Sequence, residues 1–279
     1  WRLVAGLRYT DETRRASGES WTELADGTIV PGDTRDQERK MDKPLSGKLA
    51  LEFRPSDSVL AYASVNRGTK SGGFNSIELP PENREFSDER LTAFELGTKI
   101  SLGAATTLNA AAFYYDYNGY QLRNLDQALL EVFINNNDAE VYGGEVELFT
   151  RPARNLDLAL GLSLLDATVF DLYREVSGQV FHFPERVMQQ APPFTFNAAV
   201  TWRLPLGSSG RRLDLHTNFN WVDAQQYTAY NDPSLEQEPY LYGYASVTYR
   251  PRRDNWQAFI WVKNLFNEEY RRGGDDVSL

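Results

Sequence analysis

Residues 194–204 read FTFNAAVTWRL and residues 212–222 read RLDLHTNFNWV, with the linker PLGSSGR between them. In both stretches every second residue is apolar or aromatic, with Thr217 as the exception, and most of the residues between them are polar. This alternation with a period of two is typical of a β-strand whose two faces meet different environments. The two stretches and their short linker predict an antiparallel hairpin with one apolar face.

The same alternation runs through the rest of the chain. Leucine occupies positions 156, 158, 160, 162 and 164, and helical spacing is not sustained anywhere. Most of the predicted strands are about nine or more residues long, which matches tilted membrane-crossing strands better than the strands of soluble proteins. Eleven strands are predicted, at 1–10, 46–54, 58–67, 91–102, 106–118, 140–150, 155–167, 193–204, 212–222, 241–250 and 255–266.

The connections between these strands alternate strictly in length. Short links at 55–57, 103–105, 151–154, 205–211 and 251–254 take turns with long ones at 11–45, 68–90, 119–139, 168–192 and 223–240. An up-and-down barrel in an outer membrane has short periplasmic turns and long extracellular loops. A Greek-key sandwich has no reason to place every long loop at one end. We expect the long loops to be functional, because long structureless loops are uncommon in compact domains.

Aromatic residues, 13% of the chain, lie near the ends of the predicted strands. Membrane barrels carry aromatic girdles at both lipid–water boundaries. A general preference of aromatics for strands is the alternative explanation. The predicted girdle residues are Trp1, Tyr9, Phe53, Tyr62, Phe113, Tyr115, Tyr117, Trp202, Trp221, Tyr249, Trp256 and Trp261.

Composition and length narrow the class of protein. A net charge of −10 argues against a nucleic-acid partner, and the absence of cysteine removes disulfides and thiolate chemistry. No run of 18 apolar residues predicts a membrane helix, and the first nine residues alternate like a strand instead of resembling a signal peptide. The fold prediction is therefore all-β: a transmembrane antiparallel up-and-down barrel. Because bacterial barrels have even strand numbers, eleven strands predict that residues 1–279 are an incomplete barrel segment.

An enzyme is not predicted. His182 and His216 are the only imidazoles, and no Gly-x-Ser-x-Gly elbow accompanies them. Glycine pairs at 72–73 and 273–274 do not open a helix after a strand, so they do not predict a phosphate cradle. Glu145 and Glu147 share one strand face, where a glycosidase-like pair is the alternative to a structural role. A hydrolase using His216 near the rim is a distant further alternative.

The polar strand faces predict a wall that lines the barrel lumen. Carboxylates on this wall are expected to form salt bridges with arginines or to contact a domain inside the barrel. Glu145→Leu should therefore weaken the stability of the barrel or the docking of that domain, and it should abolish no enzymatic turnover. The predicted wall consists of Lys48, Glu52, Arg54, Lys99, Glu145, Glu147 and Arg203.

Aromatic and basic residues at the exits of strands into long loops predict a ligand site at the extracellular mouth. Aromatic rings stack on flat ligands, and arginine or lysine attracts anionic complexes. The candidates are Arg67, Lys70, Phe74, Tyr117, Tyr120, Arg123, Tyr227 and Tyr230, with Tyr240 and Tyr242 flanking the last loop. Weak Ca²⁺ binding by Asp223, Asp232, Glu236 and Glu238 is the alternative to solvated loop charge. No resident metal or cofactor is predicted.

Four strings link the chain to a known family. They are NRGTKSGGFN at 66–75, FELGTK at 94–99, NNDAEVYGGEVE at 136–147 and VKNLFNEEY at 262–270. In their order and spacing they resemble segments of TonB-dependent outer-membrane receptors, in particular the siderophore-receptor branch.

The resemblance implies a 22-stranded barrel in the bacterial outer membrane, an N-terminal plug in its lumen and energy coupling through a periplasmic TonB protein. The implied function is active uptake of a ferric siderophore or a similarly scarce nutrient, with outer-membrane lipid around the barrel. The sequence departs from the family pattern in lacking the plug and the closing strand. Uptake of a vitamin or carbohydrate, a passive or structural barrel, and a soluble β-rich binding domain are the alternatives.

Overall fold

The computed structural model describes residues 1–41, 44–126, 131–176, 179–253 and 255–274. Within these residues the chain forms strands and three short 3-10 helices, and no helix is long and apolar enough to cross a membrane. The principal strands are β1 Arg2–Tyr9, β4 Leu45–Ser56, β5 Val59–Lys70, β8 Glu89–Leu102, β9 Thr106–Asp126, β10 Glu131–Ala153, β11 Leu156–Val176, β13 Phe194–Leu206, β14 Arg211–Val222, β17 Tyr240–Arg250 and β18 Ala258–Lys263.

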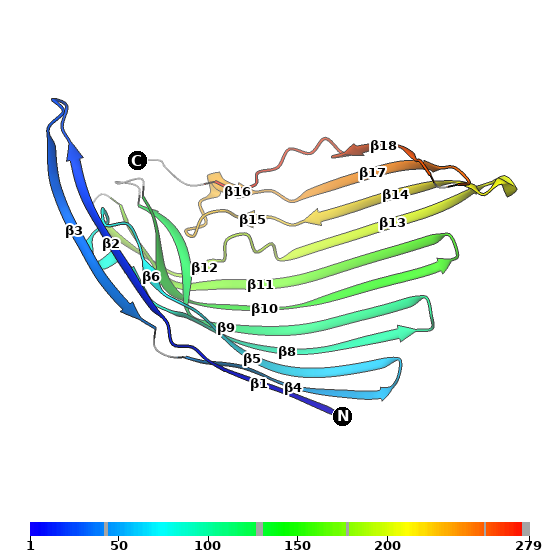
Figure 1. The fold of residues 1–279 in the computed structure, drawn as a ribbon, viewed down its shortest axis with the longest axis horizontal. Helices are drawn as coiled ribbons and strands as arrows, with labels where there is room; N and C mark the ends of the chain where they lie inside the picture. The colour runs from blue at the N-terminus through cyan, green and yellow to red at the C-terminus, as the bar shows by residue number, and fades with distance from the viewer. Residues whose placement is uncertain (42–43, 127–130, 177–178, 254, 275–279) are drawn as a thin grey trace.

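These strands form one antiparallel sheet in the order β1-β4-β5-β8-β9-β10-β11-β13-β14-β17-β18. Each strand therefore pairs with the next principal strand along the chain, as in an up-and-down barrel. The sheet curves into an open wall with β1 and β18 at its edges (Figure 1). The eleven predicted strands and their order are confirmed, although β18 is shorter than the predicted 255–266.

The two faces of the sheet differ in chemistry. Strand register places Leu51, Leu96 and Leu162 on one face, and these side chains are 45%, 65% and 37% exposed. The opposite face carries charged and amide side chains and lines the hollow of the curved wall. Leucines lie open on the outer face because a membrane barrel turns its apolar side to lipid. The chain therefore forms a partial transmembrane β-barrel.

The long connections contain strands that the sequence analysis did not predict. Residues 11–45 contain β2 Thr13–Glu23 and β3 Ile29–Lys40, a hairpin that projects beyond the sheet (Figure 1). β9 and β10 continue through most of 119–139, and 168–192 contains the end of β11 and β12 Gln179–Val187. β2 and β3 have polar residues on both faces, and β12 mixes Val180, Phe181, Phe183 and Val187 with polar residues, so hydrophobic alternation does not reveal these strands.

Further short elements lie in the connections between the principal strands. They are β6 Gly73–Phe74, the 3-10 helix η1 Pro81–Asn83 and β7 Glu85–Phe86 between β5 and β8, η2 Gly207–Ser209 between β13 and β14, and β15 Gln225–Gln226, η3 Pro233–Leu235 and β16 Glu236–Gln237 between β14 and β17. All but η2 lie at the long-loop end of the sheet.

The predicted aromatic girdle is also corrected. Trp1, Tyr9, Phe53, Trp202, Trp221 and Tyr249 lie on the outer face, as a girdle requires. Tyr62, Phe113, Tyr115, Tyr117 and Trp261 instead belong to the inner face by register. In the run Phe113–Tyr117, aromatics occupy four of five positions, so alternation alone did not say which of them face lipid.

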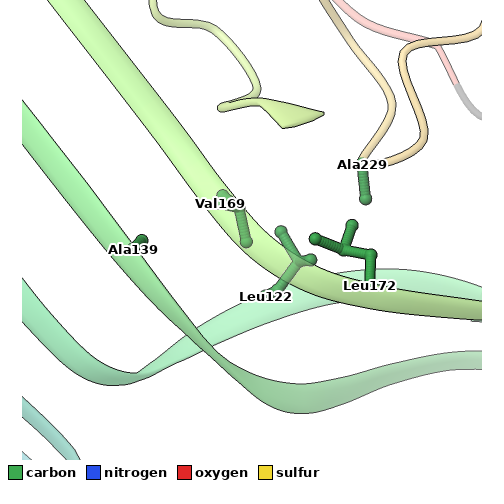
Figure 2. Packing of buried hydrophobic residues seen from close by; sticks show 5 residues of the cluster. All are labelled: Leu122, Ala139, Val169, Leu172 and Ala229. Atoms are coloured by element: carbon green, nitrogen blue, oxygen red, sulfur yellow. The ribbon is translucent and has the colours of Figure 1, made fainter. Parts of the chain in front are cut away.

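The tightest packing lies above the membrane-spanning part of the sheet. Leu122, Ala139, Val169 and Leu172 come from β9, β10 and β11, and Ala229 reaches them from the connection after β15 (Figure 2). Each is at most 5% exposed. This apolar cluster fastens the loop at 223–239 onto the extended ends of the three strands.

Candidate functional site

Seven residues were predicted to line the lumen, and five of them lie together on the inner face of β4, β8 and β10: Lys48, Glu52, Lys99, Glu145 and Glu147. Arg54 is exposed at the turn end of β4, and Arg203 lies elsewhere. The Tyr62 hydroxyl donates to Glu95 Oε1 at 2.5 Å, and Arg2 binds both carboxylate oxygens of Glu52 at 2.7 and 2.8 Å. Asn109 Nδ2 donates to Glu147 Oε2 at 3.2 Å. A hollow of about 670 Å³ lies over the wall of β4, β5 and β8, and one of about 360 Å³ lies over β8, β9 and β10.

This inner wall carries more carboxylate than it neutralises. Glu95, Glu145 and Glu147 face the same region as Lys99, and Glu145 lies between Ala111 and Ser163 in the sheet. Glu145 was predicted as a wall residue from the sequence, whereas Glu95 is added by the structure. An open, acidic surface of this kind suits contact with basic groups inside the barrel.

Arg203, also predicted as a wall residue, lies in a separate group near the short turns. Its Nη2 binds Asp157 at 2.5 Å, and Arg151 binds the other oxygen of the same carboxylate at 2.5 Å. One strand further on, Arg212 and Arg250 bind the two oxygens of Asp214 at 3.0 and 2.8 Å. The structure therefore divides the predicted wall into an acidic part on β8–β10 and an arginine-rich part on β11–β17.

At the mouth, asparagine side chains hold irregular segments against the strands. The Asn75 amide donates to the Ile134 carbonyl at 2.8 Å and accepts from the Ile134 N–H at 2.9 Å. Asn136 makes the same pair of bonds with the backbone of Ser87, at 3.0 and 2.5 Å. A primary amide can pair in this way because it offers a donor and an acceptor like a peptide group. We call Asn75, Asn136 and Asn231 the amide clamps.

The third amide clamp fixes the loop at 223–239. Asn231 Nδ2 donates to the Val187 carbonyl at 2.8 Å, and the Val187 N–H donates to Asn231 Oδ1 at 2.9 Å. Its backbone φ of +56° is in the left-handed region, which asparagine tolerates better than most residues. Arg186 Nε also donates to the Tyr230 carbonyl at 3.2 Å. The loop is thereby tied to β12.

Three of the predicted ligand residues meet in one aromatic group. The rings of Tyr117 and Tyr120 touch edge to face at 5.5 Å, and both pack with Tyr230 against the buried cluster of Figure 2. An extra residue in β9 at Gly119, with φ of +71°, keeps Tyr120 on the same face as Tyr117. Burial raises the pKa of Tyr120 and of Tyr230 above the usual value for tyrosine.

Two arginines flank this aromatic group. The guanidinium of Arg174 lies 5.1 Å from the ring of Tyr230, and that of Arg186 lies 4.2 Å from the ring of Phe183. Phe183 in turn packs on Tyr230 at 5.7 Å. The group therefore presents aromatic faces and positive charge together at the long-loop end of the wall.

The other predicted ligand residues are dispersed. Tyr227 is buried and donates to the Arg271 carbonyl, and Phe74 lies under the guanidinium of Arg35 at 5.6 Å. Lys70 ends β5 opposite Glu89, and Arg123 lies on β9 opposite Ile134. Arg67 is exposed and belongs to the outer face of β5, away from the lumen.

Tyr240 and Tyr242, which flank the last long loop, belong to a second aromatic group. The rings of Tyr240 and Tyr270 are parallel at 4.5 Å, and Tyr242 meets Tyr270 edge to face at 6.2 Å. The residues Tyr242, Asn264, Glu268, Glu269, Tyr270 and Arg272 line an open hollow of about 740 Å³.

Both histidines have structural partners. His216 Nδ1 lies 2.9 Å from Thr201 Oγ1 on the inner wall, and His182 Nε2 lies 2.9 Å from Asp171 Oδ1. Among the described residues, no three His, Cys, Asp or Glu side chains are grouped so that they hold a metal ion. That finding includes the acidic residues at 223–238, so the Ca²⁺ alternative receives no support from the geometry.

Sequence reasoning missed Phe183, Arg174, Arg186 and the amide clamps. No local pattern distinguishes these residues, because the contacts that bring them to the mouth join positions 44 to 59 apart in sequence. The one usable signal was composition, since the NNN run at 135–137 is unusual for a strand.

Comparison with known proteins decides the class. A family model described as "TonB dependent receptor-like, beta-barrel" matches residues 1–265. The chain belongs to the TonB-dependent receptor family. Receptors of this family reside in the outer membrane of Gram-negative bacteria, and the family is one of transport receptors and not of enzymes.

Solved structures share the fold of this receptor chain. The ferric yersiniabactin uptake receptor FyuA from Yersinia pestis matches with a TM-score of 0.76 and 20% identity, over 98% of this chain and 39% of FyuA. The siderophore receptor PiuA from Acinetobacter baumannii matches with 0.69 and 17%, over 96% and 37%. The copper transporter OprC matches with 0.69 and 18%, over 96% and 40%. The chain thus spans about two fifths of the length of these receptors.

Proposed function

We propose that this chain is part of a receptor that takes up a ferric siderophore, or a similarly scarce chelate, across the outer membrane with energy supplied through TonB. Membership in the family supports the transport role. Among the similar structures, FyuA and PiuA are named as receptors for siderophores. This function extends to the whole protein, of which the chain is about two fifths by comparison.

The observation that carries the cargo proposal is the arginine-flanked aromatic group at the mouth. Tyr117, Tyr120, Tyr230 and Phe183 present ring edges and faces, with Arg174 and Arg186 beside them. Aromatic rings stack on flat chelating groups, and guanidinium groups attract an anionic ferric complex. Iron here is cargo and not a resident cofactor.

The acidic inner wall supports a second element of the proposal. Glu95, Glu145 and Glu147 form a carboxylate surface inside the curved sheet, where a plug domain of the whole receptor would contact it. In this proposal the plug moves when TonB pulls on it, and the ligand follows. Glu145→Leu should then weaken plug docking while leaving the barrel folded.

Three alternatives remain within membrane transport. OprC is named as a copper transporter, so a copper complex is one alternative cargo. A vitamin or a carbohydrate is another, because specificity resides in loops. A passive or structural barrel is the third, and it requires no energy coupling.

The test expresses the full-length receptor in a Gram-negative strain that makes no siderophore and lacks its own receptors for ferric siderophores. Uptake of radioactive iron is measured with a tris-catecholate, a tris-hydroxamate and a phenolate chelate, with and without TonB. TonB-dependent uptake of one chelate is the expected result. Equal uptake without TonB would indicate a passive pore, and uptake of cobalamin, maltodextrin or a copper complex alone would replace the iron cargo.

A further inference from the structure

Basic charge is concentrated at three short turns of a chain that is acidic overall. The segments 151–157, 203–214 and 250–255 contain eight arginines against three aspartates, a net charge of +5, whereas the whole chain carries −10. These segments contain no lysine and no glutamate. The arginines are Arg151, Arg154, Arg203, Arg211, Arg212, Arg250, Arg252 and Arg253.

The three turns lie next to one another. They join β10 to β11, β13 to β14 and β17 to β18, which are consecutive pairs at one end of the sheet (Figure 1). A Cβ added at Gly210 would lie 3.2 Å from Arg252 Cγ, so the Arg252 side chain rests on the neighbouring turn. The other two short turns differ: residues 54–58 hold one arginine and one aspartate, and residues 102–106 hold no charge.

The arginines form two tiers. The inner tier, described above, binds Asp157 and Asp214 on the lumen side. The turn tier consists of Arg154, Arg211, Arg252 and Arg253, all of which are exposed. Within the part of the chain that the structure describes, none of these four has an ion pair, and only Arg211 has a side-chain partner, Ser209 Oγ at 2.8 Å. The turn tier is therefore open to an anionic partner.

Aromatic side chains lie beside the turn tier. Trp202 is on the outer face of β13 and is 45% exposed, and Trp256 is 54% exposed. Tyr249, on the outer face of β17, packs against Trp256 at 5.6 Å. Tryptophan and tyrosine favour the lipid–water boundary, and arginines immediately beyond that boundary stand at the height of the headgroups.

We propose that the turn tier binds the anionic headgroups of phospholipids in the periplasmic leaflet of the outer membrane. Short turns of bacterial barrels face the periplasm. The arrangement favours a lipid as the partner, because the four arginines lie directly beyond the apolar and aromatic residues of the outer face. An acidic protein segment inside the lumen would meet the inner tier, whose arginines already bind aspartates.

The test is lipid retention by the full-length receptor, purified in detergent with equal amounts of phosphatidylglycerol and phosphatidylcholine. Native mass spectrometry counts the lipids that remain bound. The variant carries Arg154→Gln, Arg211→Gln, Arg252→Gln and Arg253→Gln together. The control is Arg54→Gln, which removes an exposed arginine at the end of β4, next to a short turn at the same end of the sheet that carries no excess positive charge. Circular dichroism verifies that each variant keeps its strand content.

The wild type should retain phosphatidylglycerol over phosphatidylcholine by roughly fivefold or more, and the turn variant should show no preference. The control should behave like the wild type. Salt at 0.5 M, where the Debye length is about 4 Å, should abolish the preference. A wild type without preference, or a turn variant that keeps it, would overturn the proposal. Loss of preference only in an Arg203→Gln, Arg250→Gln variant would also overturn it and assign the charge to a partner in the lumen. Neither result depends on iron uptake.

Discussion

The sheet and the mouth of this receptor are held together by different kinds of hydrogen bond. In the membrane-spanning part, β9 and β10 pair through their backbones from Thr106–Thr150 to Tyr117–Ala139 without a break. At the mouth, the amide clamps Asn75, Asn136 and Asn231 attach irregular segments to strands through their side chains.

The surroundings explain the difference. Hydrocarbon offers no hydrogen-bonding partner, so every peptide group in the membrane must pair with a neighbouring strand. At the mouth, water satisfies whatever the fold leaves unpaired, and irregular backbone is permitted. A regular ladder therefore needs no particular side chain, whereas the shape of the mouth depends on individual ones. Four predictions test this contrast.

The same truncation should cost much more stability at the mouth than on the lipid-facing side of the sheet. Leu122→Ala opens a cavity in a cluster where the side chain is 1% exposed, and it should destabilise the mouth by about 2–5 kcal/mol. Leu162→Ala on the outer face should cost much less, because lipid fills the space. Denaturant unfolding of the full-length receptor in lipid vesicles, with amide hydrogen exchange at 120–125 and 167–173, measures both. Equal losses would contradict the contrast.

An introduced arginine should also cost different amounts of stability on the two faces of one strand. Leu162→Arg places a guanidinium against lipid near the middle of the membrane-spanning part of β11, and it should cost about 2–4 kcal/mol. Ser163→Arg, one position along, points to the inner wall opposite Glu145 and should cost much less. The yield of folded protein on insertion into vesicles and its unfolding midpoint report the difference. A larger loss for Ser163→Arg than for Leu162→Arg would contradict the assignment of the lipid-facing side.

Removing an amide clamp should loosen the mouth and leave the ladder intact. Asn231→Ala loses two hydrogen bonds to Val187, and at about 1 kcal/mol for each the local stability should fall by about 1–3 kcal/mol. Asn231→Gly loses the same bonds but accepts the positive φ, so it should be less destabilising than alanine. Hydrogen exchange at Val187 measures the loss, with exchange at Val200 on β13 as the internal control. Equal acceleration at both amides would show that the clamp supports the whole barrel.

The smallest effect should appear at alkaline pH. Burial raises the pKa of Tyr230 in the folded state, so the unfolded state loses its proton first as pH rises. The stability that depends on the protonated phenol is present below about pH 10 and is lost as pH rises through the higher folded pKa. Hydrogen exchange in the loop 223–239 should therefore quicken above pH 10, after correction for intrinsic exchange. Tyr230→Phe should remove that extra pH dependence, and an unchanged profile would remove Tyr230 as its source.

Much of the sheet was predictable because the membrane imposes one rule on every strand. The leucines at 156–164 and the alternation at 194–222 located strands, and the alternating loop lengths predicted their order. The rule failed where both faces of a strand are polar, as in β2 and β3, and where apolar residues fall on both faces, as in β12. It also failed to choose a face in Phe113–Tyr117, where aromatics crowd four of five positions.

The candidate site was predictable only in part. Tyr117, Tyr120 and Tyr230 were expected at the mouth, and the structure brings them together. Their convergence depends on the extra residue at Gly119 and on the clamp of Asn231 across 44 positions of sequence. Phe183 and Arg186 join them only because β12 folds back along β11.

The amino-acid sequence by itself determined which face of most membrane strands is apolar, how the strands follow one another and at which end the long segments lie. Those properties come from nearest neighbours along the chain and from the difference between lipid and water. Only the tertiary structure decided which aromatic rings share a group, which asparagines act as clamps and which turns combine their arginines. Such contacts join residues far apart in sequence, and their free energy depends on geometry that no local pattern specifies.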